Sequence, residues 1–133
     1  MSEDVLIPIV DRNDNVIEYK PRKSLGLHEI NRITTLWITN GQGEILIARR
    51  SLKKKSDPGL WGVAVAGTVE QGETYEENVV KEAHEEIGLA GVPFVFCKKY
   101  FYDGPCPFVS AIFTCVVNWP IEKFTLQVEE VDK

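Results

Sequence analysis

Residues 67–89 read GTVEQGETYEENVVKEAHEEIGL and carry the most informative charge pattern in the chain. Three glutamates, Glu82, Glu85 and Glu86, crowd one short segment beside a loop that contains glycine. Like charges three and four residues apart repel each other on a helix, so a stable fold does not need such a cluster for its own sake. We therefore expect a positive partner, and the glycine-bearing loop points to a divalent metal ion and a phosphate group.

The second half of this stretch predicts a helix from about Thr74 to Ile87. Thr74 and Glu77 have the Thr-x-x-Glu spacing of a capping box, and Gly88 follows the last helical residues, where a left-handed residue readily ends a helix. At roughly 100° per residue, the three glutamates project within a narrow arc. The apolar residues form a separate stripe, which consists of Val80, Ala83 and Ile87.

Oxygen ligands of this kind are typical of a magnesium site. Mg²⁺ prefers carboxylate and carbonyl oxygen, and it usually keeps several waters and substrate phosphates in its shell. The alternative is a solvated acidic helix face, which would be favoured for an isolated Glu-x-x-Glu-Glu. Here a loop with Gly67, Gly72 and Glu73 follows an apolar strand at residues 61–66 and leads into the helix. Loop, ligands and helix therefore form one unit.

The same residues resemble the Nudix box, Gly-x5-Glu-x7-Arg-Glu-U-x-Glu-Glu-x-Gly-U, in which U is a bulky apolar residue. The matching positions are Gly67, Glu73, Glu82, Glu85, Glu86, Gly88 and Leu89. The pattern fixes many positions over a long span, so a chance match is improbable. Two positions depart from it, because Lys81 stands where the family has arginine and Ala83 is small where the family usually has a larger residue.

The resemblance implies attack of a metal-activated water on a diphosphate, with release of a nucleoside monophosphate or another phosphate ester. It implies Mg²⁺ as the cofactor, with Mn²⁺ as an alternative ion. Glu85 and Glu86 are then the principal ligands, together with the backbone carbonyl of Gly67. Glu82 is either a third ligand or the general base. The expected substrate is a small-molecule diphosphate, such as a nucleoside diphosphate linked to another moiety.

Lys81 is expected to pair with Glu73 and to orient the adjacent Glu82, which is the role that the family gives to its arginine. Lysine keeps the charge but lacks the planar guanidinium fork, so we expect a looser pair and either a slower enzyme or one in which another group supplies the orientation. A harmless exchange is the alternative. In several family members the general base is a glutamate of a later loop, and Glu129 or Glu130 would be the candidate here.

The segment before the box, residues 27–67, is similar to the Nudix subgroup that contains isopentenyl diphosphate isomerase. In that isomerase a catalytic cysteine and a metal-binding histidine flank the loop glycine, whereas this chain has Ala66 and Thr68. Without a thiol at position 66 no proton donor for double-bond migration is evident, so hydrolysis is favoured. An isomerase-like enzyme and a catalytically idle domain that binds a nucleotide or a protein remain as alternatives.

Basic residues upstream of the box are candidates for substrate binding. Arg49 and Arg50 lie at a predicted strand end, before the lysines at positions 53–55, and such charges hold diphosphate oxygens well. The alternative is a solvated loop, which we favour for the lysines. Trp61 is placed to stack on a base, but an aromatic residue in an apolar strand is more often part of the core.

Composition indicates one globular domain of 133 residues with a net charge of −5. No apolar stretch approaches membrane length, residues 1–10 lack the basic region of a signal peptide, and the negative charge disfavours nonspecific nucleic-acid binding. We expect a cytoplasmic protein that binds neither nucleic acid nor membranes. Three cysteines without a Cys-x-x-Cys pair indicate neither a disulfide framework nor a zinc site, and Cys97 and Cys115 are expected in the core.

The fold class expected from the pattern and the resemblance is α+β, a Nudix-type α/β/α sandwich with a mixed central sheet. An N-terminal hairpin is predicted within residues 1–22. The predicted strands cover residues 5–10, 16–19, 33–39, 44–48, 61–66, 94–102 and 108–118.

The C-terminal helix of the sandwich has no counterpart in the sequence, because the chain stops at residues 129–133, EEVDK. We therefore expect a truncated C-terminal helix. A sheet without this cover would expose apolar surface, and a homodimer partner is expected to fill the gap.

Overall fold

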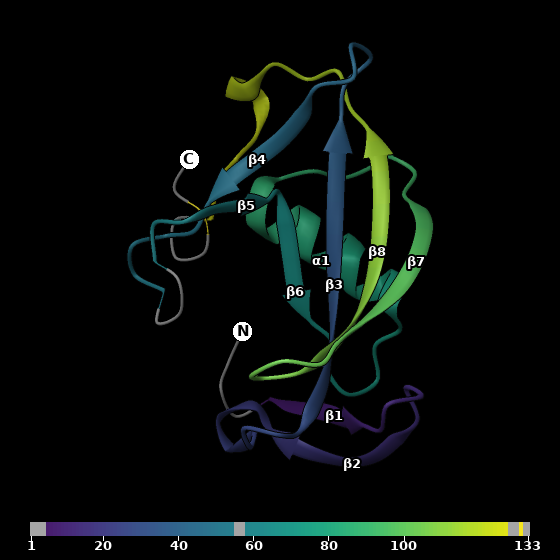
Figure 1. Cartoon of the computed structure of the whole chain (residues 1–133). Coiled ribbons are helices and arrows are strands. Elements are labelled where there is room, and N and C mark those ends of the chain that lie inside the picture. Colours follow the sequence, from purple (N-terminus) through teal and green to yellow (C-terminus); the bar gives the residue numbers. More distant parts are fainter. Residues whose placement is uncertain (1–4, 55–57, 128–130, 132–133) are drawn as a thin grey trace.

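Figure 1 shows the computed structural model of the chain, which describes residues 5–54, 58–127 and 131. The strands are β1 (Leu6–Val10), β2 (Val16–Pro21), β3 (Ile30–Thr39), β4 (Ile45–Arg49), β5 (Trp61–Val63), β6 (Val65–Thr68), β7 (Val95–Tyr102) and β8 (Phe108–Val116). The helical segments are α1 (Tyr75–Ile87) and the two 3-10 turns η1 (Arg22–Ser24) and η2 (Ile121–Lys123). Within the described part of the chain, α1 is the one α-helix.

The long strand β3 organises the sheet. It pairs in parallel with β8 and antiparallel with β1, β4 and β6, while β7 extends the sheet beyond β8. In Figure 1, α1 lies against one face of this sheet and the β1–β2 hairpin lies at the end of β3 where that strand begins. A mixed sheet with a helix on one face confirms the predicted α+β class. Within the predicted N-terminal hairpin region, β1 and β2 pair antiparallel.

The ends of α1 form as its sequence predicts. Thr74 Oγ1 accepts a hydrogen bond from the backbone N–H of Glu77 at 3.0 Å, and the Glu77 carboxylate accepts one from the backbone N–H of Thr74 at 2.9 Å. Gly88, with a φ of 72°, provides the left-handed C-cap. This reciprocal capping satisfies two amide groups that the first turn would otherwise leave without a partner.

The apolar stripe of α1 differs by one residue from the prediction. Val79, Ala83 and Ile87 are buried, whereas Val80 is 56% exposed. Val79 and Ala83 are four residues apart and lie over one another on a helix, while Val80 projects about 100° further round. The buried stripe packs against β3, β6 and β8, and the core residues on these strands are Leu36, Ile38, Val65, Ala111, Phe113 and Cys115.

Three further expectations are corrected by the sheet. The predicted strand at 61–66 is interrupted at Ala64, because β5 pairs with β4 whereas β6 pairs with β3. Trp61 is 54% exposed at this edge, so its assignment to the core is wrong. Cys97 is exposed where the β7 register shifts, although Cys115 is buried as expected.

No helix in the described ranges is long and apolar enough to cross a membrane. The sheet face that points away from α1 carries partly exposed apolar side chains. Trp37, Ile47 and Val116 on this face are 39%, 52% and 60% exposed. They alternate along their strands with Ile38, Leu46 and Cys115, which belong to or pack against the core.

Candidate functional site

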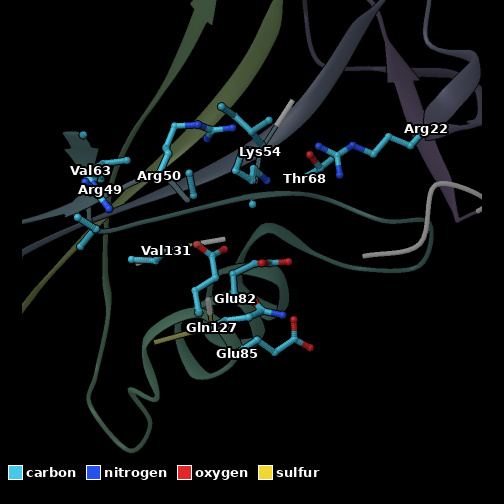
Figure 2. Close-up of a pocket in the computed structure, with 17 residues that line it drawn as sticks. Arg22, Arg49, Arg50, Lys54, Val63, Thr68, Glu82, Glu85, Gln127 and Val131 are labelled. Atoms are coloured by element: carbon cyan, nitrogen blue, oxygen red, sulfur yellow. The ribbon is translucent and has the colours of Figure 1, made fainter. Parts of the chain in front are cut away.

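A pocket of about 330 Å³ lies between α1, the ends of β4, β5 and β6, and the segment that carries η1. The residues of the 67–89 stretch that line it are Gly67, Thr68, Glu82, Glu85 and Glu86. Figure 2 shows the labelled carboxylates of Glu82 and Glu85 on the helix side, with basic side chains across from them. The structure therefore brings the sequence-predicted acidic residues to one cavity.

The three glutamates reach this pocket from consecutive turns of α1. Glu82 and Glu86 are 9% and 5% exposed, while Glu85 lies in the more open part of the site. Gly67 makes room for Glu82, because a Cβ atom added at Gly67 would lie 2.6 Å from the Glu82 Cδ atom. A side chain at position 67 would therefore displace this carboxylate.

The donor chemistry of the site fits a hard divalent cation. Within residues 5–54, 58–127 and 131, no three His, Cys, Asp or Glu side chains already surround one metal position. The pocket nevertheless offers three carboxylates beside the Gly67 backbone, and magnesium typically completes its shell with water and substrate oxygens instead of an all-protein cage. Glu82, Glu85, Glu86 and the Gly67 carbonyl are the groups able to hold it.

Lys81 links the helix to the loop that precedes it. Its Nζ atom lies 2.7 Å from Glu73 Oε2, 2.9 Å from Glu70 Oε2 and 3.9 Å from Glu82 Oε1. Burial alone would lower the pKa of Lys81, but hydrogen bonds to Glu73 and Glu70 outweigh it and raise the pKa above its usual value. The ammonium group is therefore charged at neutral pH, and the expected pair with Glu73 is present.

Glu73 is held by more than this lysine. Burial would raise the pKa of Glu73, but hydrogen bonds from Lys81, from the backbone N–H of Glu70 and from Asn78 hold it below the usual value. The Glu70 N–H and the Asn78 amide donate to Oε1 of Glu73 at 2.8 and 3.0 Å. Glu73 is therefore an ionised carboxylate at neutral pH, and its hydrogen bonds hold the end of the loop in place.

Asn78 is a structural residue of the site that the sequence reasoning missed. It is fully buried, accepts a hydrogen bond from Thr34 Oγ1 at 2.6 Å and donates to the Thr68 carbonyl at 3.0 Å. Together with its bond to Glu73, these contacts join α1 to β3, to β6 and to the loop. The signal was an asparagine in a helix interior, where that residue is disfavoured unless its amide has partners.

Basic side chains form the other side of the pocket. Arg49 and Arg50, the candidate substrate-binding residues, line it, and Lys54 lines it as well. The assignment of the lysines to a solvated loop is therefore wrong for Lys54, whereas Lys53 is exposed outside the pocket lining and Lys55 lies outside the described residues. Figure 2 shows Arg50 and Lys54 above the carboxylates.

Two segments far from the box also contribute. Arg22 enters from η1, and Gln127 and Val131 enter from the C-terminal segment. The backbone N–H of Gln127 donates to the Glu86 carbonyl at 2.9 Å, which attaches this segment to the end of α1. Val131 forms a bridge with Arg50, whereas the candidate bases Glu129 and Glu130 lie outside the described residues.

Ala66 and Thr68 flank Gly67 at the pocket surface. Neither residue provides a thiol or an imidazole. The positions that carry the isomerase chemistry in the resembling subgroup therefore have no acid or base here.

Comparison with known proteins identifies the family of the chain. Residues 30–132 match the NUDIX domain family. An uncharacterized Nudix hydrolase of Yersinia pestis is 36% identical over 129 residues, which cover 96% of this chain and 69% of the relative. The uncharacterized Nudix hydrolase YfcD of Escherichia coli K12 is 34% identical, with 96% and 70% of the two chains covered.

Among solved structures, DR0079 from Deinococcus radiodurans superposes with a TM-score of 0.84. The match covers 96% of this chain and 79% of that protein, at 22% sequence identity. At this identity the likeness establishes the fold alone, and it confirms the predicted sandwich architecture.

Proposed function

We propose, since the chain belongs to the NUDIX domain family and is a Nudix-type pyrophosphohydrolase, that it is a Mg²⁺-dependent enzyme acting on a nucleoside diphosphate linked to another moiety. The observation that carries the proposal is the pocket itself, in which three α1 carboxylates lie across from basic side chains. Such a site binds a metal ion and a diphosphate together. The names of the relatives give the reaction class and no substrate.

The metal is assigned to Glu85, Glu86 and the carbonyl of Gly67. A bound Mg²⁺ supplies an acidified water and neutralises phosphate oxygens. Mn²⁺ has the same preference for oxygen ligands and is the alternative ion. The pocket lining supports this assignment, because Gly67, Glu85 and Glu86 line the same cavity.

Lys81 and Glu73 position the catalytic carboxylate in this proposal. Their ion pair ties the helix turn that precedes Glu82 to the loop. Glu82 either accepts the proton of the attacking water or serves as a third ligand. The two roles are separable, since Glu82→Gln abolishes metal binding only if Glu82 is a ligand, and otherwise lowers kcat with metal binding intact.

Arg49 and Arg50 are assigned to the substrate diphosphate. A guanidinium group donates two parallel hydrogen bonds to phosphate oxygens, and this fixes orientation as well as charge. Their place at the end of β4, across the pocket from the glutamates, supports the role.

A substrate screen tests the proposal. Nucleoside di- and triphosphates, dinucleotides, nucleotide sugars and isopentenyl diphosphate are incubated with Mg²⁺ and wild type, Glu85→Gln or Glu76→Gln. Glu76 is the matched control, because it lies on the same helix, is exposed and does not line the pocket. Glu85→Gln should lose more than about 100-fold in kcat/KM, beyond the usual cost of an outer-shell partner. Equal activity of Glu85→Gln and wild type would exclude this mechanism.

The similarity of residues 27–67 to the isomerase subgroup stays a prediction about the scaffold. Ala66 at the pocket favours hydrolysis, and turnover of isopentenyl diphosphate to its isomer in the same screen would reverse this preference.

The cytoplasm is the proposed location. Cys97, Cys106 and Cys115 are all free thiols, and thiols persist in a reducing compartment. Cell fractionation of the tagged protein tests this part of the proposal.

A further inference from the structure

We infer that Arg22, at the end of the N-terminal hairpin, is a substrate-binding residue that contacts a phosphate group at the end of the pocket opposite Arg49. The inference rests on the proposed function and adds a binding residue from outside residues 30–132, the part that matches the NUDIX domain family.

Arg22 lines the same pocket as Glu82 and Glu85. Figure 2 shows its side chain extending from the hairpin side, with the guanidinium group directed toward Thr68, whereas Arg49 and Arg50 enter from the other side. Thr68 directly follows Gly67, so Arg22 approaches the part of the loop assigned to the metal. A phosphate bound there would lie within reach of both groups.

The backbone that carries Arg22 is fixed relative to the loop. The Arg22 N–H donates to the Val5 carbonyl at 3.1 Å, and Pro21 pairs with Leu6 across the hairpin. The Leu6 carbonyl accepts a hydrogen bond from the backbone N–H of Gln71, which lies in the loop between β6 and α1, at 2.9 Å. The backbone hydrogen bonds at Val5 and Leu6, where β1 begins, therefore connect the backbone of Arg22 to the loop.

The turn of the same hairpin is anchored separately. Asp14 accepts hydrogen bonds from Arg32 at 2.6 Å, from Tyr75 at 2.9 Å and from Lys99 at 2.6 Å. Tyr75 is the first residue of α1, so this cluster joins the hairpin turn to the helix that carries the glutamates. Because both ends of the hairpin are held by these contacts, the backbone at Arg22 loses little conformational entropy when a ligand binds.

Charge supports a substrate with at least two phosphate groups. The described pocket lining contains the basic residues Arg22, Arg49, Arg50 and Lys54 and the acidic residues Glu82, Glu85 and Glu86. A single divalent cation would leave the pocket strongly positive, although the whole chain has a net charge of −5. Basic groups at both ends match a diphosphate that extends along the pocket better than a single phosphate.

The experiment compares wild type with Arg22→Ala, Arg22→Lys and Arg12→Ala. Arg12 is the matched control, because it belongs to the same hairpin, is 69% exposed and pairs with Asp103 away from the pocket lining. Binding of inorganic pyrophosphate is measured by titration calorimetry in the presence of Mg²⁺, and KM and kcat are measured with the best substrate of the screen. Circular dichroism melting verifies that each variant is folded.

Arg22→Ala should raise the pyrophosphate Kd and the KM by about 10- to 100-fold, as expected for loss of a charged hydrogen bond, with a smaller effect on kcat. Arg22→Lys should recover part of the loss, and Arg12→Ala should match wild type. Inorganic monophosphate should bind wild type more weakly than pyrophosphate does, and its Kd should differ less between wild type and the Arg22 variants.

The outcomes separate the two proposals. If wild type hydrolyses a substrate and Arg22→Ala keeps its KM and its pyrophosphate Kd, the inference is wrong and the proposed function stands. If no substrate is turned over but Arg22→Ala weakens pyrophosphate binding and Arg12→Ala does not, the proposed function is wrong, whereas the contact of Arg22 with a phosphate group stands. Failure of wild type to bind pyrophosphate, or an equal loss in Arg12→Ala, overturns the inference.

Discussion

Lys81 and Glu73 form a close ion pair, with 2.7 Å between Nζ and Oε2, at the position where the Nudix box has an arginine. The lysine also reaches Glu70 at 2.9 Å, so its single ammonium group joins two carboxylates of the loop to α1. A point charge with several donors can bridge partners in different directions, which partly replaces the planar fork of arginine.

Removing the charge at Lys81 should impair catalysis more than folding. We predict that Lys81→Met lowers kcat/KM by about 10- to 100-fold, because Glu73 and Glu82 lose their common partner. Lys81→Arg should retain most of the activity. Steady-state kinetics with Mg²⁺ measures both effects, and Lys98→Met, at an exposed position of β7, is the control. Equal kinetics for Lys81→Met and Lys98→Met would contradict the positioning role.

Asp14 should contribute stability that depends on pH. Burial would raise its pKa, but hydrogen bonds from Lys99, Arg32 and Tyr75 hold the pKa below the usual 3.8. A carboxyl group whose pKa is lower in the folded state than in the unfolded state stabilises the folded protein. This contribution is complete at pH values above the unfolded-state pKa, and it is lost as the pH falls through the folded-state pKa. Asp14→Asn removes the charge and leaves Arg32 and Lys99 without their common anion.

We predict that Asp14→Asn lowers the free energy of unfolding by roughly 1–3 kcal/mol near neutral pH, less than a fully buried pair because Lys99 is 49% exposed. The difference should shrink on acidification below about pH 4. Urea unfolding across this range measures it, with Asp103→Asn as the control for an exposed pair. A difference that is constant with pH would show that the charge of Asp14 is not the cause.

The elements with strong local signals were predictable from sequence. The helix predicted at 74–87 is observed as Tyr75–Ile87 with Thr74 as its N-cap, because capping and the glycine stop act within a few residues. The β3–β4 hairpin follows in the same way from the turn at 40–43. Local hydrogen bonds decide these boundaries, and the sequence contains them.

Whether an individual side chain faces the core or the surface depends on tertiary contacts that the sequence alone does not determine. Val79 and Val80 both fit an apolar stripe, and the position of the sheet decides that Val79 is buried. Trp61 is exposed since β5 lies at an edge, and Cys97 is exposed where a register shift interrupts β7. Propensity cannot indicate edges and bulges that arise from strand order.

The residues of the candidate site also divide into those that the sequence predicts and those that only the tertiary structure brings together. Glu82, Glu85 and Glu86 were predictable because they lie on one continuous segment with Gly67. Arg22 and Gln127 come from opposite ends of the chain, and only the docking of their segments against the box brings them into the pocket. No motif spans such distances in sequence.

The apolar sheet face away from α1 predicts self-association. Trp37, Ile47 and Val116 are partly exposed on this face, and contiguous apolar surface often marks an interface. We predict that wild type forms a homodimer and that Ile47→Lys shifts it to monomer in light scattering at equal concentration. Ile17→Lys is the control, because Ile17 is 63% exposed on β2 of the N-terminal hairpin. A wild-type monomer at every concentration would refute the prediction.

The contact between Gly67 and Glu82 gives the sharpest test of the acidic site. An alanine Cβ at position 67 would lie 2.6 Å from Glu82 Cδ, so the carboxylate must move. We predict that Gly67→Ala weakens Mn²⁺ binding by about 10- to 100-fold and lowers the free energy of unfolding by about 1–3 kcal/mol. Gly62→Ala is the control, since a Cβ there meets no atom within 4 Å.

A double-mutant cycle then separates this clash from a general loss of backbone freedom. If Gly67→Ala acts by displacing Glu82, its destabilising effect should largely disappear in a Glu82→Ala background, where nothing remains at that position to collide with the new methyl group. Mn²⁺ titration and urea unfolding of the four proteins measure the coupling. Strictly additive effects would mean that position 67 requires glycine for a reason independent of Glu82, and the close approach seen between these two residues would not be what holds the carboxylate in the pocket.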